Sequence, residues 1–123
     1  MTRNPDATTA LNRWANEPFA YLTTAGRKTG KSHRIEIWFA VDDGALYLLS
    51  GGRDRSDWVK NLQANPGVAI ELGPETLAGV AEVIESDSPE DAKARKLLVQ
   101  KYRKADELDD WGRASLPIVI RFS

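Results

Sequence analysis

The feature that most constrains the fold is a glycine-rich basic segment that leads into a strand and not into a helix. The segment Ala25-Gly-Arg-Lys-Thr-Gly-Lys-Ser32 fits a loosened form of the phosphate loop of nucleotide hydrolases. That loop needs a helix directly after it, whose N-terminal amides point at the phosphates. Residues 34–41 instead alternate with the period of a strand. The apolar positions of this alternation are Ile35, Ile37, Phe39 and Val41. We therefore reject a nucleotide hydrolase and expect a loop between two strands.

Turn and cap signals predict a mainly β protein with short helices. The Asp42-Asp43-Gly44 turn joins the strand at 34–41 to its neighbour in a hairpin. Six strands are expected, at residues 19–24, 34–41, 45–50, 68–72, 77–84 and 116–122. Helices are expected to begin at Thr8 or Thr9, at Ser56 or Asp57, and at Ser88-Pro89. These elements fit a small closed or split barrel in one domain, residues 1–123, with residues 1–8 as a loose N-terminal arm.

Composition excludes several classes of function. The formal net charge is −1, so no overall field attracts the chain to nucleic acid, and we expect no nucleic-acid partner. The chain has no cysteine and only one histidine, His33, which excludes thiol chemistry and multi-histidine metal sites. No apolar run approaches membrane-spanning length, and the first residues do not form a secretory signal. We expect a cytoplasmic protein with no integral membrane segment, in which difficult redox chemistry would need an organic cofactor.

Two segments form a candidate anion site. The first is the basic loop, whose cationic side chains are Arg27, Lys28, Lys31 and Arg34. An exposed hairpin turn with solvated charges would explain this loop equally well. The second segment, Ser50-Gly51-Gly52, stands at a strand end before a helix, where free amides can approach a ligand. Together the two segments suggest a site for a phosphorylated ligand.

Two tryptophans and an acidic run allow plainer interpretations. Trp58 and Leu62, four residues apart, could form the core face of their helix. Trp38 lies on the strand face opposite the apolar residues and is expected to meet a partner subunit or a ligand. The acidic residues 106–110 are expected to form a solvated loop without metal-ligand spacing.

The order of the motifs resembles that of a known enzyme family. Leu22-Thr-Thr-Ala-Gly-Arg-Lys-Thr-Gly-Lys31, Leu48-Leu-Ser-Gly-Gly52 and Trp58-Val-Lys-Asn-Leu-Gln-Ala-Asn-Pro66 are similar to segments of the deazaflavin-dependent nitroreductase (quinone reductase) family. That family belongs to the flavin/deazaflavin oxidoreductases with an FMN-binding split β-barrel. The resemblance spans about Phe19 to Phe122 and implies a six-stranded split β-barrel that binds coenzyme F-420, a two-electron hydride carrier.

The resemblance also implies the site. Lys31 and His33 or Arg34 lie near the matching positions, which are Arg27, Lys28, Thr29, Ser50, Gly51, Gly52, Trp58 and Asn61. In the family the loop residues meet the anionic part of the cofactor, the serine–glycine segment lines the deazaflavin ring, and the last two border the pocket. His33 stands where the family often has arginine. Only Tyr102 represents the several tyrosines that nitroimidazole-reducing members have near their C-terminal strands.

The activity implied is hydride transfer from C5 of the reduced deazaflavin to a small electron-poor acceptor such as a quinone, an enone or a nitro compound. Ser50 is the candidate catalytic hydrogen-bond donor. FMN in the same barrel is the nearest alternative, since Arg27 and Lys28 could hold its single phosphate. A non-catalytic module that binds a flavin, haem or tetrapyrrole is a second alternative, and a barrel with a merely solvated loop is a third. A homodimer is expected.

Overall fold

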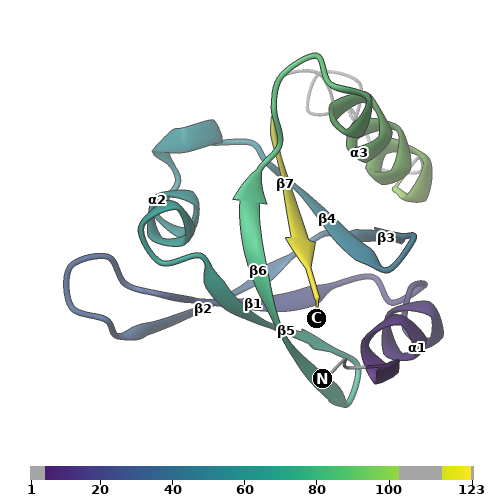
Figure 1. Ribbon diagram of the computed structural model, residues 1–123, viewed down its shortest axis with the longest axis horizontal. Helices are drawn as coiled ribbons and strands as arrows, with labels where there is room; N and C mark the ends of the chain where they lie inside the picture. The colour runs from purple at the N-terminus through teal and green to yellow at the C-terminus, as the bar shows by residue number, and fades with distance from the viewer. Residues whose placement is uncertain (1–4, 103–114, 123) are drawn as a thin grey trace.

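The protein folds as one curled antiparallel sheet flanked by helices. The computed structural model describes residues 5–102 and 115–122. The strands are β1 (Ala20–Ala25), β2 (Ser32–Ile37), β3 (Ala40–Asp42), β4 (Ala45–Ser50), β5 (Gly67–Leu72), β6 (Glu75–Val83) and β7 (Leu116–Arg121). They pair in the order β2-β1-β5-β6-β7-β4-β3. Figure 1 shows the sheet curling on itself, which confirms the predicted barrel of the split type.

The strand expected at 34–41 is in fact two strands. β2 ends at Ile37 and β3 begins at Ala40. β2 pairs with β1 and β3 pairs with β4, so one continuous stretch supplies both edges of the sheet. The sheet therefore has seven strands where six were expected. The physical reason is that the chain crosses from one edge to the other at Trp38-Phe39, and side-chain alternation does not report which neighbour a strand has.

The core lies inside the curl, and a second cluster lies outside it. Leu46 and Leu48 of β4 point into the main core, whereas Tyr47 and Leu49 pack outward against a helix. Every residue of β4 is buried for this reason. A strand covered on both faces carries a nearly continuous apolar sequence, as Ala45-Leu-Tyr-Leu-Leu does.

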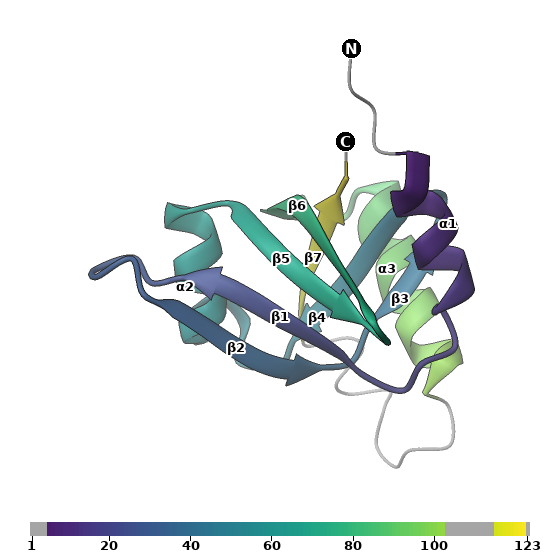
Figure 2. The ribbon, with the colours of Figure 1, turned by 90° about the horizontal axis from the view of Figure 1, so that it is seen from below.

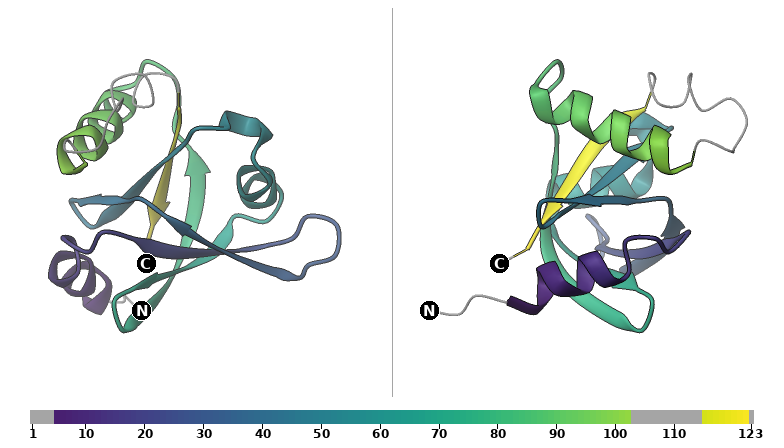
Figure 3. Two further views of the ribbon diagram at one scale, coloured as in Figure 1. Left: turned by 180° about the vertical axis from the view of Figure 1, so that it is seen from behind. Right: turned by 90° about the vertical axis from the view of Figure 1, so that its right-hand side faces the viewer.

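Three α-helices cover the ends and the outside of the sheet. They are α1 (Pro5–Arg13), α2 (Asp57–Ala64) and α3 (Pro89–Lys101), and a short 3-10 turn, η1 (Arg53–Arg55), precedes α2. α3 and α1 lie on either side of the β3–β4 edge, while α2 lies near the β1–β2 hairpin (Figures 1 and 3). No helix in the described ranges is long and apolar enough to cross a membrane.

The helix starts were predicted with mixed success. α1 begins at Pro5, so the arm expected to be loose through residue 8 is helical from residue 5 onward; proline suits a first helical position because that position needs no N–H. α3 begins as expected, with Ser88 Oγ accepting a hydrogen bond of 3.1 Å from Asp91 N. α2 ends at Ala64, before Asn65-Pro66, as expected. Residues 1–4 of the predicted arm and the acidic run at 106–110 lie outside the described residues.

Candidate functional site

A groove of about 660 Å³ lies between the β1–β2 hairpin and α2. Seven of the residues predicted for the site line this groove, namely Arg27, Lys28, Thr29, His33, Arg34, Trp58 and Asn61. Figure 2 shows the hairpin extending past the barrel beside α2. The structure therefore brings together the loop and helix segments that the sequence placed far apart. Asp57, which was predicted only as a possible helix cap, also lines the groove.

Two glycines shape the hairpin. Gly26 N donates to Lys31 O and Gly30 N donates to Gly26 O, both at 2.8 Å, which closes the loop on itself. Gly30 has a φ of 74°, which favours glycine. A Cβ at Gly26 would lie 2.9 Å from His33 Nε2 and 3.2 Å from Lys31 O. The glycine spacing is therefore required by the turn itself, whatever the loop binds.

Arg27 joins the hairpin to α2. Its backbone N–H and its Nη1 both donate to Asn61 Oδ1, at 3.2 and 2.8 Å. Its Nη2 lies 3.4 Å from Asp57 Oδ1, an exposed carboxylate. Part of the positive charge of Arg27 is thus already engaged within the protein.

Arg34 is engaged more completely. Its guanidinium makes two hydrogen bonds to Glu71 of β5, at 2.7 and 3.1 Å, and lies 4.0 Å from the centroid of the Tyr21 ring. These bonds lower the pKa of Glu71 and raise that of Arg34. Arg34 borders the groove, but its charge is directed across β1 to Glu71 of β5.

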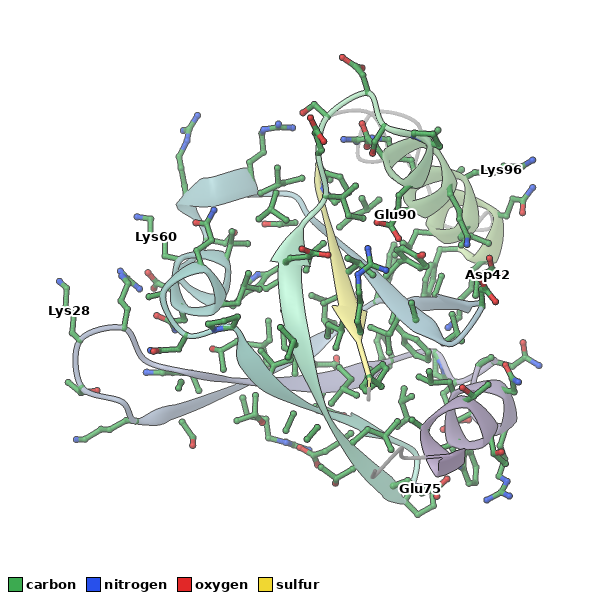
Figure 4. The ribbon with its side chains drawn as sticks, in the orientation of Figure 1. Lys28, Asp42, Lys60, Glu75, Glu90 and Lys96 are labelled. Carbon is green, nitrogen blue, oxygen red and sulfur yellow. The ribbon has the colours of Figure 1, made fainter. Side chains whose placement is uncertain are left out.

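The two lysines of the loop have no such partner in the part of the chain that the structure describes. In residues 5–102 and 115–122, no ion pair is formed by Lys28 or Lys31. Figure 4 shows Lys28 at the tip of the hairpin, with Lys60 of α2 projecting on the same side of the molecule. Lys31 does not line the groove. The cation that is both in the groove and without a carboxylate partner among the described residues is therefore Lys28.

The serine–glycine segment lies outside the groove lining. Ser50 is only 2% exposed, and its Oγ is 3.0 Å from both Arg53 O and Ser56 Oγ. A carbonyl oxygen can only accept, so the hydroxyl hydrogen of Ser50 points to Arg53 and is not free for a ligand. A Cβ at Gly52 would lie 2.4 Å from Ser56 Oγ. Ser50, Gly51 and Gly52 therefore form the turn that leads into α2, and this structure does not aim Ser50 at the groove.

A second, smaller groove lies further along β2. It has a volume of about 290 Å³ and is lined by Phe19, Glu36, Ile37, Trp38 and Leu49. Ile35 borders the first groove and Ile37 the second, so the two grooves follow each other along β2. Phe19 is 41% exposed and was expected only as a strand residue, because the sequence does not show which aromatic side chains remain exposed.

Trp38 stacks within its own chain. Its ring lies parallel to that of Tyr102 at the end of α3, with centroids 4.3 Å apart. The Tyr102 hydroxyl accepts from Phe39 N at 3.1 Å and lies 2.9 Å from Pro18 O. Lys101 Nζ donates to Phe39 O at 2.9 Å, and partial burial lowers the pKa of this lysine to about 8. The end of α3 thus holds the crossing between β2 and β3. Because Tyr102 covers one face of the Trp38 ring, a partner subunit is not needed to cover it.

Comparison with known proteins decides the family. The sequence pattern of the family described as F420H(2)-dependent quinone reductase matches residues 1–122.

The chain belongs to this family.

A family relative, the F420H(2)-dependent quinone reductase Rv1261c of Mycobacterium tuberculosis, is 33% identical over 79 residues. That match covers 62% of this chain and 53% of the relative, so the chain spans about half the length of the relative. Among solved structures, an F420-H2 dependent reductase, FDR-A, has a TM-score of 0.70 at 25% identity and covers 85% of this chain and 95% of its own. The haem storage protein HutZ of Vibrio cholerae has a TM-score of 0.72 at 16% identity, covering 100% of this chain and 92% of its own. At that identity the likeness to HutZ concerns the fold alone.

Proposed function

We propose that this chain is an F-420-dependent oxidoreductase, which binds the cofactor in the hairpin–α2 groove and reduces a quinone or another small electron-poor acceptor. Family membership supports the cofactor and the reaction class. The observation that carries the proposal for the site is the groove itself, because it unites Arg27, Lys28 and Thr29 with Trp58 and Asn61. Reduced F-420 supplies a hydride from C5 of its deazaflavin ring.

The residues present fit such a cofactor. F-420 carries a phosphodiester and an oligoglutamate tail, both anionic. Lys28 offers a charge that no carboxylate of the described residues pairs with, and Arg27 has five side-chain N–H donors, of which the two described contacts engage two. Charge-assisted donors of this kind suit phosphate and carboxylate oxygens. Trp58 adds a half-buried aromatic surface beside them.

The remaining predicted residues would act less directly. Thr29 Oγ1 accepts from Lys31 N at 3.3 Å, so it helps hold the loop. Ser50, Gly51 and Gly52 would contribute through the position of α2, since Ser50 bonds to the segment directly before that helix. Lys31 would add to the positive potential near the groove, while Arg34 lines the groove with its charge engaged by Glu71.

The second groove is the proposed place for the acceptor. Phe19 and Trp38 provide aromatic surfaces, and Ile37 and Leu49 provide apolar ones. Planar electron-poor rings stack well on such surfaces. Because both grooves follow β2, an acceptor there would approach a cofactor that enters from the hairpin end.

We also propose that two copies of the chain associate. Val80 is a large apolar side chain that is 55% exposed. A second copy that covered it would remove apolar surface from water. A structural neighbour with a TM-score of 0.71 and 24% identity is described as a domain-swapped dimer. Light scattering on the purified protein tests the dimer, and cell fractionation tests the predicted cytoplasmic location.

The decisive experiment is a fluorescence titration of the purified protein with oxidised F-420 and, separately, with FMN. Saturation by F-420 at micromolar or lower concentration, followed by oxidation of reduced F-420 in the presence of a quinone, is the expected result. Preference for FMN would assign the protein to the flavin branch of the fold. An intense Soret band in the purified protein would point to haem. Binding of none of these would contradict the proposal.

A further inference from the structure

Asn61 of α2 and Asn65, the residue directly after α2, connect the helix to the β1–β2 hairpin. Asn61 is buried at 3% exposure and accepts two hydrogen bonds from Arg27. Its Nδ2 lies 3.4 Å from Thr24 Oγ1 of β1. Asn65, one turn later, reaches the carbonyl oxygens of Ala25 and Gly26 at 3.4 and 3.5 Å. The shorter and more buried contacts belong to Asn61.

The acceptor capacity of Asn61 is used within the protein. An amide oxygen has two lone pairs, and the backbone N–H and the Nη1 of Arg27 occupy both. Asn61 Oδ1 is therefore not free to accept from a ligand. Its contribution to binding must pass through the residue that it holds.

The hairpin depends on this contact for its place. Residues 27–31 are exposed, and the turn is held by its own backbone bonds and by the Thr29 side chain, while Asn65 adds only longer contacts to the hairpin. Trp58 stands one turn before Asn61 on α2. The contact between Asn61 and Arg27 thus fixes the distance between the cationic wall of the groove and its aromatic wall.

We propose that Asn61 is a positioning residue, which sets the direction of Arg27 and the width of the groove without contacting the cofactor through its oxygen. This inference rests on the proposed function only for the identity of the ligand. The contact between Asn61 and Arg27 is independent of the proposed function. Asparagine suits the role because an apolar side chain of similar size would bury the Arg27 donors without an acceptor.

Hydrogen exchange of the ligand-free protein tests the contact directly. In Asn61→Ala we expect the backbone amides of the hairpin, Arg27 first, to exchange about tenfold faster than in the wild type, since one protecting acceptor is lost. Asn61→Asp keeps oxygen acceptors for Arg27, and the Thr24 hydroxyl can donate to its carboxylate, so protection should be retained. Asn65→Ala, directly after the same helix and with longer contacts to the hairpin, should change exchange by less than about twofold.

Cofactor titration gives the second readout. Asn61→Ala should weaken F-420 binding about tenfold in the wild-type background. In an Arg27→Ala background the same change should have little further effect, because residues that act through one contact are not additive. Circular dichroism checks that each variant folds, and Asn61→Asp keeps the test valid if the alanine variant does not.

The outcomes separate the two proposals. Faster hairpin exchange in Asn61→Ala, with protection retained in Asn61→Asp, supports the positioning role. Unchanged hairpin exchange in Asn61→Ala overturns it, whatever the titration shows. A wild-type protein that does not bind F-420 contradicts the proposed function, while the exchange data still decide the contact. Full additivity of Asn61→Ala and Arg27→Ala in F-420 binding would show that Asn61 acts independently of Arg27 and would also overturn the inference.

Discussion

Removal of the Lys28 side chain is the sharpest test of the basic loop. Arg34 already has Glu71 as a partner and Arg27 has Asp57, whereas no carboxylate pairs with Lys28 among the described residues. The Lys28→Ala variant should therefore lose a charge that faces the ligand, without the loss of any ion pair that the described residues form. We expect weaker binding of oxidised F-420 with unchanged stability.

The magnitude follows from the exposure of the residue. A hydrogen bond to a charged group contributes about 1.5–3 kcal/mol, and an exposed ion pair about 0.2–1 kcal/mol. Lys28 is exposed at the hairpin tip, where solvent screens its charge. We therefore expect a loss of about 1 kcal/mol, which is about a fivefold rise in Kd. In about 1 M salt, where the Debye length falls to about 3 Å, the difference should largely disappear.

Lys96 offers a matched control. It is also an exposed lysine, and it lies on α3 at the opposite side of the molecule (Figure 4). Lys96→Ala makes the same change in net charge at a distance from the groove. Fluorescence titration of both variants at low and high salt is the assay. If Lys28→Ala and Lys96→Ala bind F-420 equally well at low salt, the loop is a solvated surface and the argument for the site fails.

Three further predictions concern other parts of the molecule. Asp57→Asn removes a carboxylate from the groove, so F-420 should bind about two- to threefold more tightly at low salt, as measured by the same titration. Gly73→Ala should lower the free energy of unfolding, measured in urea, by about 2–4 kcal/mol. The reason is that φ of Gly73 is 55° and a Cβ there would lie 2.9 Å from the Trp14 ring. An unchanged urea midpoint would contradict this prediction. Burial in the folded state lowers the pKa of Lys101 from 10.5 to about 8, so between pH 8 and pH 10.5 the unfolded chain binds more protons than the folded one. The wild type should therefore gain stability relative to Lys101→Met as the pH rises through this window, as measured by urea unfolding. A stability difference that does not depend on pH would show that Lys101 titrates normally.

Local signals predicted most elements of the fold. The Asp42-Asp43-Gly44 turn, the Ser88 cap and the proline after Asn65 each act on their immediate neighbours, and the structure has all three where they were expected. The break at Trp38-Phe39 could not be predicted in the same way. It depends on which distant strand accepts each half of the stretch and on the hydrogen bonds of Tyr102.

The site was predicted as a set of residues but not as a pattern of charges. Motif order placed Arg27, Lys28 and Trp58 at one site, and the groove contains them. Sequence gave no sign that Glu71 of β5 would take up the charge of Arg34, because that pairing requires β1 to lie between the two strands. It also gave no sign that Ser50 would turn toward Arg53 and Ser56. Such partners are set by tertiary contacts, which single-sequence motifs do not encode.

The place of β7 in the sheet has a consequence for how the chain folds. β7 lies between β6 and β4, and its Leu116 pairs with Ser50 of the first half of the chain. Until residues 116–121 are available, β4 and β6 each present an unpaired edge, and the main core lacks Ile118 and Ile120. Closing so long a loop costs entropy before any contact compensates for it, so this pairing should limit the folding rate. During synthesis the nascent chain would therefore expose two aggregation-prone edges, and its folding should become productive only when β7 has left the ribosome.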